Sequence, residues 1–436
     1  MQKKIPLVIG LGITGQSLVN YLSLSHKEIF LIEEWIENPY LKEIIQEDLK
    51  VHLNPKIDDK LLKRVSEIYP SPGIPSDHLI FSYALKHKVN ISSDIQLFIE
   101  RNRSKKILVT GTNGKTSTSL FLTSLFQSYL PHLKIATLGN IGRSVLSCIN
   151  EDIDLSIIEV SSFQLELLGD VEFDIGLLLN VEQDHLNRHR NFEDYKAIKY
   201  SILKKSDHKI SFDTSNPFSK DFINYKNFKL PENLSDSKIF EYWPSHDKEN
   251  LKAAITTLNT YVSNFTNLSL ENFNSYSELE KAFKDFTKPP HRFELLGQIN
   301  GVNYINDSKA TNIDATLKAL SAVSEMAKEG DIYLICGGDL KEQDISSSNL
   351  DVIRRVKKAF IYGKDKELIN KSISWYAESK CVSDLDEAVK NSKEISKKGD
   401  HVILSPACSS LDMFKDYKDR GNKFKRLIKE LNYESI

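Results

Sequence analysis

The chain has 436 residues, which at roughly 150 residues per domain is enough for about three domains. Hydrophobic residues make up 40% and charged residues 27% of the chain, and this composition excludes a disordered or low-complexity protein. The formal net charge of -2 excludes the broad basic surface that drives nonspecific nucleic-acid binding. We therefore expect no nucleic-acid partner, and local sites for any charged ligand.

No apolar run reaches the roughly 20 residues that a membrane-spanning helix needs. The N-terminal stretch MQKKIPLVIGLG passes directly from charged residues into a strand-like run, which is unlike a signal peptide. The four cysteines are far apart and show no metal-binding spacing. We expect a soluble, cytoplasmic protein of a reducing compartment, with no membrane partner, that works as a monomer.

Short β-branched runs alternate with longer amphipathic stretches along most of the chain. The clearest runs are 5–9, 107–109, 155–160, 175–180, 332–336 and 402–404. This rhythm predicts βαβ units, and thus an α/β fold with largely parallel sheets. A fresh strand after RNRSKK and a proline pair near 289 suggest two boundaries, and we predict domains at 1–95, 96–297 and 298–436.

The first motif is GLGITG at 10–15, which follows a strand-like run and opens an amphipathic stretch. Such glycines let backbone N–H groups and a helix N-terminus approach a diphosphate. Glu33, at the end of the next strand-like run, would then bind a ribose or a base. The motif indicates a nucleotide-diphosphate site, by default for NAD or FAD; alternatively the glycines serve only helix–strand packing.

The second motif is TGTNGKT at 110–116, again between a strand-like and a helix-like segment. Lys115 can reach the β and γ phosphates of a nucleotide, Thr116 can bind magnesium, and the loop amides can form an anion nest. The usual P-loop pattern has a glycine where this chain has Val109. The flanking strand and helix make a chance GKT in a turn the weaker interpretation.

Two nucleotide-type motifs in one chain favour an enzyme that uses ATP to activate a group attached to a second nucleotide. An NAD or FAD oxidoreductase would leave Lys115 without a role, and an ordinary ATPase has no use for the first motif. Glu159 and the pair Asp184-His185 follow further strand-like runs, where metal ligands often lie, although each could equally be a cap or a loop residue. By composition alone, Lys199 is a surface lysine.

Further segments accompany these motifs along the whole chain. They are SPGI at 71–74, GNIG at 139–142, EVSSFQLE at 159–166, NVEQDHLNRH at 180–189, YKAIK at 195–199, PHRFE at 290–294, NDSKATN at 306–312, GGDLKEQD at 337–344 and SPACSSLDMFKDYKDRGNKF at 405–424. With VIGLGITG and TGTNGKTS, they resemble the Mur ligase family nearly end to end. The segments NDSKATN and SPACSSLDMF resemble the members that add D-glutamate.

The resemblance implies a Rossmann-like N-terminal domain for a UDP-linked substrate, a central P-loop ATPase domain with a mainly parallel sheet, and a Rossmann-like C-terminal domain that delivers the amino acid. The implied reaction is ATP-dependent addition of D-glutamate to UDP-N-acetylmuramoyl-L-alanine through an acyl phosphate, in peptidoglycan synthesis. Another amino-acid acceptor, or a folylpolyglutamate-type reaction, stays open as an alternative.

The resemblance also implies the site residues. The UDP-linked substrate would contact Gly12, Ile13, Thr14, Glu33, Gly73, Asn140, Gln164 and His185. ATP would contact Gly111, Thr112, Asn113, Gly114, Lys115, Thr116, Ser117, Asn250, Arg292 and Asp307. D-Glutamate would contact Lys309, Thr311, Lys341, Ser410 and Tyr417.

Two Mg²⁺ ions are implied, held by Thr116, Glu159, His185 and Lys199, with Lys115, His185 and Lys199 in catalytic roles. A cationic lysine cannot bind a metal, so the resemblance implies that Lys199 carries a carbamate derived from CO2. The chain departs from the family at three points: Glu33 replaces a frequent aspartate, Asp247 an asparagine and Tyr417 a phenylalanine.

Overall fold

The computed structural model describes most of the chain. The described residues are 4–35, 37–44, 48–185, 188–212, 221–232, 234, 237, 239–240, 243–268, 275–327, 329–341, 343, 345 and 350–433. None of the helices within these ranges combines the length and the apolar character that a membrane crossing requires.

The chain forms three α/β domains, each built on its own sheet, which confirms the predicted fold class. Two sheets belong to one compact unit, made of Met1–Val181, Glu193–Lys229 and Leu251–Ala282. The third sheet belongs to a second unit, made of Glu182–Phe192, Leu230–Asn250 and Phe283–Ile436. The boundaries predicted after residues 95 and 297 stay predictions; they fall within helix α5 (Asp94–Arg101) and strand β12 (Glu294–Ile299).

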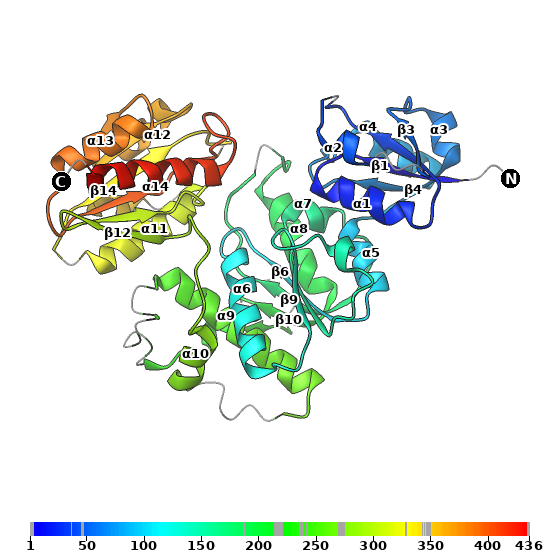
Figure 1. Cartoon of the computed structure of the whole chain (residues 1–436), viewed down its shortest axis with the longest axis horizontal. Helices are drawn as coiled ribbons and strands as arrows, with labels where there is room; N and C mark the ends of the chain where they lie inside the picture. The colour runs from blue at the N-terminus through cyan, green and yellow to red at the C-terminus, as the bar shows by residue number, and fades with distance from the viewer. Residues whose placement is uncertain are drawn as a thin grey trace. The chain divides into compact units, whose positions relative to one another are not determined.

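The N-terminal sheet is fully parallel, in the order β3-β2-β1-β4-β5, and is drawn in blue in Figure 1. Its elements are β1 (Ile5–Ile9), α1 (Ile13–Ser23), β2 (Glu28–Ile32), α2 (Tyr40–Glu43), β3 (Lys50–Leu53), α3 (Asp59–Arg64), β4 (Val65–Pro70), α4 (Leu79–His87) and β5 (Asn90–Ile91). Alternate residues of β1 enter different apolar clusters: Leu7 packs with residues of α3 and α4, and Val8 with residues of α1. The sheet is therefore the middle of three layers.

The central sheet is also parallel, in the order β11-β10-β9-β6-β8-β7. Its elements are β6 (Lys105–Thr110), α6 (Lys115–Tyr129), β7 (Ile135–Gly139), the 3-10 helix η1 (Val145–Cys148), β8 (Leu155–Glu159), α7 (Ser162–Glu166), β9 (Phe173–Leu178), α8 (Phe192–Lys204), β10 (Ser206–Ser211), β11 (Ile223–Asn224), the 3-10 helix η2 (Tyr225–Asn227), α9 (Ser245–Phe265) and α10 (Tyr276–Phe283). Strand β6 lies between β9 and β8, where the connections leave in opposite directions. Open α/β sheets bind ligands at such a switch point.

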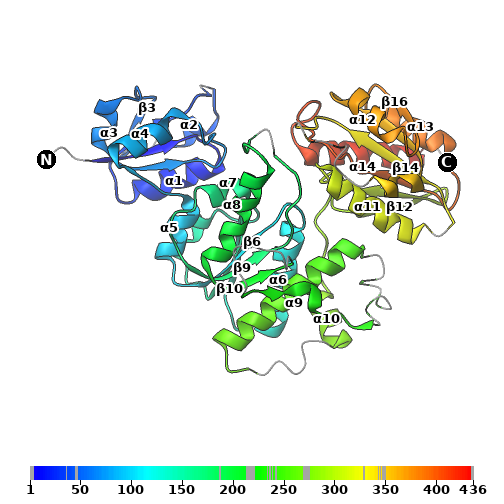
Figure 2. The same ribbon diagram turned by 180° about the vertical axis from the view of Figure 1, so that it is seen from behind.

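The C-terminal sheet is mixed, in the order β12-β13-β17-β14-β15-β16, because β12 pairs antiparallel with β13. Its further elements are β13 (Val302–Asn306), α11 (Ile313–Met326), β14 (Ile332–Gly337), the 3-10 helix η5 (Asp351–Arg355), β15 (Val356–Tyr362), α12 (Lys366–Ile373), β16 (Glu378–Cys381), α13 (Leu385–Ile395), β17 (His401–Leu404) and α14 (Tyr417–Tyr433). Alternate strand residues pack against α11 and α12 on one face and against α13 and α14 on the other. Helix α14 crosses this sheet in Figure 1, and Figure 2 gives the view from behind.

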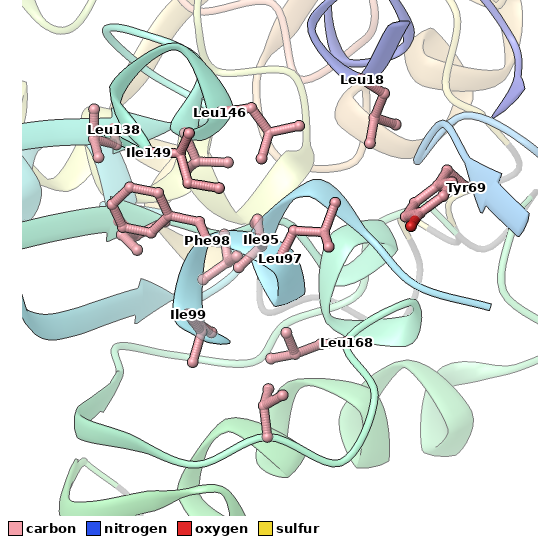
Figure 3. Packing of buried hydrophobic residues seen from close by; sticks show 14 of the residues in the cluster. Leu18, Tyr69, Ile95, Leu97, Phe98, Ile99, Leu138, Leu146, Ile149 and Leu168 are labelled. Carbon is pink, nitrogen blue, oxygen red and sulfur yellow. The ribbon is translucent and has the colours of Figure 1, made fainter. Parts of the chain in front are cut away.

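One apolar cluster joins the two sheets of the first unit. It contains Leu18 of α1 and Tyr69 of β4 from the N-terminal sheet, Ile95 and Phe98 of α5, and Leu146 of η1 (Figure 3). All five side chains are buried. The N-terminal and central domains therefore share a core.

Candidate functional site

Residues predicted to bind a UDP-linked substrate follow three neighbouring strands of the N-terminal sheet. In the register of this sheet, Ile9 at the end of β1 lies opposite Ile32 of β2 and Pro70 of β4. The glycine loop, Glu33 and Gly73 continue from these three ends. The topology thus brings Gly12, Ile13, Thr14, Glu33 and Gly73 to one edge of the sheet, on both sides of its switch point. The other members of the predicted set, Asn140, Gln164 and His185, follow β7, β8 and β9 of the central sheet.

The Glu33 carboxylate organises this edge. It accepts hydrogen bonds from the backbone N–H of Leu11 at 2.6 Å and of Trp35 at 2.8 Å, and from the Asn38 amide at 3.0 Å. Its own side chain is only 9% exposed. Glu33 therefore holds the glycine loop in place, a role that sequence reasoning did not anticipate.

The glycines of this loop have different surroundings. A Cβ atom on Gly15 would lie 2.0 Å from the carbonyl oxygen of Gly10, so α1 can approach the loop only with glycine there. At Gly12 a Cβ atom would meet nothing within 4 Å. Gly12 and Ile13 are exposed at the N-terminus of α1, and Thr14 is half-buried. The close packing of α1 against Gly10 explains why residue 15 is a glycine, whereas the open space at Gly12 suits the approach of a ligand.

The loop between β6 and α6 is clamped from two sides. Asn113 donates its backbone N–H to the Asn180 side chain at 2.8 Å, and the Asn180 amide donates back to the Asn113 carbonyl at 3.0 Å. The Thr112 hydroxyl is 2.9 Å from the Tyr195 hydroxyl. Gly111 has a φ of 157°, and a Cβ atom there would lie 2.9 Å from the Leu179 Cβ. The loop therefore has a fixed shape, as an anion nest requires.

Lys115 begins α6 and lies against the loop. Its Nζ donates to the carbonyls of Gly111 at 2.8 Å and Thr112 at 2.9 Å. Gly114, with a φ of 85°, precedes it as the N-cap, and Ser117 lies in the first turn of the helix. The cation and the helix N-terminus thus meet at the predicted phosphate position.

Thr116 and Glu159 form a buried pair at the ends of neighbouring elements. The Thr116 hydroxyl donates to Glu159 Oε2 at 2.8 Å, and Asn140 donates to Glu159 Oε1 at 3.1 Å. Glu159 is 2% exposed at the end of β8. Hydroxyl and carboxylate oxygens are ligands that Mg²⁺ accepts, so the pair fits the predicted first metal.

Gln164 caps α7 and is buried. Its side-chain oxygen accepts from the Ser161 backbone N–H at 2.9 Å, and its own N–H donates to the Ser161 hydroxyl at 3.2 Å. This capping box fixes the turn that follows Glu159.

Lys199 is not a surface lysine: it is 1% exposed. Its Nζ donates to the Gly111 carbonyl at 2.9 Å and lies 4.9 Å from the centre of the Tyr195 ring. The Lys199 side chain thus extends from α8 to the loop after β6. Figures 1 and 2 show α8 beside the central sheet. The end of the Lys199 side chain therefore lies at the P-loop, which fits the predicted role of this residue at the phosphates.

No three His, Cys, Asp or Glu side chains within the described ranges group as a metal site. Of the four residues predicted to hold Mg²⁺, two are of these types, Glu159 and His185. The other two are Thr116, with its hydroxyl, and Lys199. Glu159 and Lys199 belong to the first compact unit, and His185 belongs to the second. His185 has a φ of 55°, and its N–H donates to its neighbour Asp184 at 2.8 Å.

Asn250 is buried in α9. Asp247, which stands where the resembled family has an asparagine, lies three residues before it in the same helix. Lys288 Nζ lies 2.5 Å from Asp247 Oδ2. Although burial alone would raise it, the pKa of the Asp247 carboxyl lies below its usual value because Lys288, His246 and Asn250 stabilise the anion. The negative charge that replaces an asparagine is thus balanced by a lysine.

Asp307 and Arg292 lie in the same unit as Asn250 and interact electrostatically with each other. Asp307 accepts from the Phe293 N–H at 3.0 Å and from the Ser405 hydroxyl at 3.0 Å. Burial raises the pKa of the Asp307 carboxyl to about 7. Asp307 therefore links the strand ends of β13 and β17 to the segment before β12.

The residues predicted for D-glutamate follow β13, β17 and β14, which are neighbours in the C-terminal sheet. Lys309 and Thr311 follow β13, Lys341 follows β14, and Ser410 and Tyr417 follow β17. Lys309 Nζ lies 4.3 Å from the centre of the Tyr417 ring. The loops are joined, since Asp339 exchanges backbone hydrogen bonds with Ser409 at 3.1 and 2.8 Å.

Sequence reasoning missed several residues that hold these loops. Asn180 and Tyr195 clamp the P-loop, and Gln343 links the Lys341 loop to the start of α11 through Ile313 N–H at 3.3 Å. Tyr195 did carry a signal, because it precedes Lys199 by four residues and thus shares a helix face with it. Asn180 follows a strand that only the sheet order places beside β6.

Three family models match the chain. Mur ligase MurD-like, N-terminal domain, matches residues 4–93; Mur ligase middle domain matches residues 109–230; Mur ligase, glutamate ligase domain, matches residues 291–408.

Similar curated proteins cover nearly the full chain. A UDP-N-acetylmuramoylalanine--D-glutamate ligase of Francisella philomiragia subsp. philomiragia is 32% identical over 98% of this chain and 96% of its own. The ligase of the same name from Protochlamydia amoebophila is 32% identical over 98% of both chains.

Solved structures share the fold at low identity. The MurF ligase from Thermotoga maritima in complex with ADP has a TM-score of 0.56 and 14% identity, over 100% of this chain and 99% of its own. The UDP-N-acetylmuramate-alanine ligase MurC from the same organism has a TM-score of 0.54 and 14% identity, over 98% and 99%.

Proposed function

This chain belongs to the Mur ligase family, and on that premise we propose that it joins D-glutamate to UDP-N-acetylmuramoyl-L-alanine at the expense of ATP, a step of peptidoglycan synthesis. ATP and UDP-linked precursors are cytoplasmic metabolites, so we place the reaction in the cytoplasm. Each of the three substrates would bind at the edge of a sheet that belongs to the same chain, so we propose that the protein works as a monomer.

The observation that carries this proposal is the convergence of the glutamate set on three adjacent strands. Lys309, Lys341 and Ser410 come from loops that are far apart in sequence, yet they follow β13, β14 and β17. D-Glutamate has two carboxylates, and its pocket needs cations and hydrogen-bond donors. The two lysines, with the hydroxyls of Thr311, Ser410 and Tyr417, supply both at one edge of the sheet.

The first chemical step activates a poor electrophile. The L-alanyl carboxylate attacks the γ phosphorus of ATP, the bond to ADP breaks, and an acyl phosphate forms. Negative charge accumulates as the two anions approach, and Lys115 with the amides of the loop at 110–116 would offset it. Asn250 would face the adenine of ATP, and Arg292 and Asp307 would contact its phosphate and its ribose.

Bound Mg²⁺ would supply Lewis-acid charge at the phosphates, with Thr116 and Glu159 as ligands of one ion, and His185 and carbamylated Lys199 as ligands of a second. The buried Thr116–Glu159 pair supports the first assignment. The position of Lys199 against the Gly111 carbonyl supports the second, because it brings the end of this buried side chain to the phosphate loop.

The second chemical step forms the amide bond. Lys309, Thr311, Lys341, Ser410 and Tyr417 would orient D-glutamate so that its amine faces the acyl phosphate. The amine attacks the acyl carbon, and the tetrahedral adduct collapses with loss of phosphate. No covalent bond to the protein is required at either step.

The test is phosphate release by the purified chain with ATP, UDP-N-acetylmuramoyl-L-alanine and a panel of amino acids. We expect release with D-glutamate and not with L-glutamate, D-alanine or L-lysine. Release only with another amino acid, or only with a folate as acceptor substrate, would show a different ligase. No release with any pair would refute the proposal.

A further inference from the structure

Arg420 is a fully buried cation in the C-terminal domain, with a residue exposure of 0%. It lies in the first turns of α14, three residues after Tyr417. Its Nε donates to the Ser308 hydroxyl at 3.0 Å, and its Nη2 donates to the carbonyls of Ser308 at 2.8 Å and Cys408 at 3.1 Å. One side chain thus connects three segments of the domain.

These three segments carry four of the five proposed glutamate residues; the fifth, Lys341, lies in the loop after β14. Ser308 directly precedes Lys309, Cys408 lies two residues before Ser410, and Arg420 itself follows Tyr417. The Ser308 hydroxyl also donates to the Tyr417 carbonyl at 2.8 Å. The network therefore runs from Arg420 through Ser308 to Tyr417, whose ring lies beside the Lys309 ammonium.

The chemistry of these contacts is unusual for a buried arginine. Within the described residues its guanidinium donates to two carbonyl oxygens and one hydroxyl, and to no carboxylate. The buried hydroxyl of Tyr362 and the carboxylate of Asp412 also interact electrostatically with Arg420. Burying a charge that donates to no carboxylate costs folding free energy, which points to a role in arranging the segments that it joins.

We propose that Arg420 is a positioning residue for D-glutamate: its guanidinium holds the loops of Lys309 and Ser410 and the start of α14 in the arrangement that binds the amino acid. A planar group with several fixed donors can bridge three backbone segments, which a lysine with one terminal nitrogen cannot do equally well. Arg420 does not contact the substrate, because its side chain is enclosed. This inference rests on the proposed function.

Steady-state kinetics of the full chain test this role. We expect Arg420→Gln to raise KM for D-glutamate by about tenfold or more, while KM for ATP and for UDP-N-acetylmuramoyl-L-alanine changes by less than about twofold. Arg420→Lys should recover part of the loss. The matched control is Arg426→Gln, which removes the same charge from an exposed site of α14.

A second variant covers the case in which Arg420→Gln does not fold. Ser308→Ala keeps the arginine and removes only the hydroxyl between Arg420 and Tyr417, and we expect KM for D-glutamate to rise severalfold. If both single variants fold, the double variant should be less than additive, because both changes break one network.

The outcomes separate the two proposals. A wild-type chain without D-glutamate-dependent phosphate release refutes the proposed function, whatever the variants do. An active wild type whose folded Ser308→Ala variant, and Arg420→Gln variant if it folds, keep the wild-type KM for D-glutamate refutes the positioning role alone. Equal increases in KM for all three substrates would indicate a change that is not specific to the D-glutamate residues and would also refute it.

Discussion

Lys199 is the residue whose burial most changes its chemical interpretation. Its side chain is 1% exposed and donates to a P-loop carbonyl, so the end of the side chain lies at the predicted phosphate position instead of in solvent. We expect Lys199→Ala to lose about a hundredfold or more of the ligase activity, and added acetate to restore part of it.

The matched control for this prediction is Lys196→Ala, which removes a less buried lysine from the same helix. Its activity should stay within about twofold of wild type. Near-normal activity of Lys199→Ala would rule out the carbamate, and so would a complete lack of rescue in a folded variant.

Asp94, at the start of α5, is a buried carboxyl whose charged form lowers the stability of the fold. It is 5% exposed, and among the described residues its Oδ1 has no hydrogen-bond partner. Burial raises the pKa of this carboxyl to about 6, so the folded chain binds an additional proton between about pH 4 and 6. Stability therefore falls as the pH rises through this range, and the full cost is present above it.

We expect Asp94→Asn to remove this dependence. Relative to wild type, the variant should gain up to about 3 kcal/mol of unfolding free energy at pH 8 and much less at pH 4. Urea unfolding of both proteins at the two pH values measures the difference. An equal gain or loss at both pH values would show that the charge of Asp94 is not the cause.

In the glycine loop that leads into α1, Gly12 and Gly15 have different tasks, and substitutions can separate them. At Gly15 a Cβ atom would lie 2.0 Å from a backbone oxygen, whereas at Gly12 it would have open space. We expect Gly15→Ala to destabilise the N-terminal domain by about 3 kcal/mol. Gly12→Ala should keep the wild-type melting temperature and weaken the binding of UDP by about tenfold or more.

Calorimetric titration with UDP and thermal melting measure these two effects independently. Titration with ADP serves as the internal control, since Gly12→Ala should leave it unchanged. Loss of melting temperature without loss of UDP affinity in Gly12→Ala would show that this glycine serves packing alone.

The shared apolar cluster makes the N-terminal and central domains depend on each other. Leu146 of η1 is 5% exposed and belongs to the same cluster as Leu18 of α1 and Phe98 of α5 (Figure 3). Leu146→Ala leaves a cavity in that cluster and should cost about 2 to 4 kcal/mol. Hydrogen exchange should then become faster in both sheets of the first unit, and should stay unchanged in β13–β17.

Exchange that accelerates only in the central sheet would show that the two domains are energetically independent. Leu385→Ala provides the matched control, because Leu385 is buried in the cluster around α13 of the C-terminal domain. That change should accelerate exchange in the C-terminal sheet instead.

The sequence by itself determined the fold class and the chemical character of the site. Alternating β-branched runs and amphipathic stretches predict parallel sheets because period and length differ between strands and helices. The motif TGTNGKT and its flanking elements likewise predict a phosphate loop, since a loop, its lysine and the next helix are contiguous in the chain. The antiparallel pairing of β12 with β13 was not predicted, because the direction of pairing depends on the hairpin between two strands and not on their residue pattern.

Only the tertiary structure decided which residues support these motifs. Glu33 holds the loop of Leu11, Asn180 clamps Asn113, and Arg420 reaches Ser308 across 112 positions of the chain. Such contacts depend on strand order and helix placement, which no local pattern encodes. The burial of Lys199 is the clearest case: its neighbours in sequence are those of a surface lysine, and packing of α8 against the P-loop makes it a buried group.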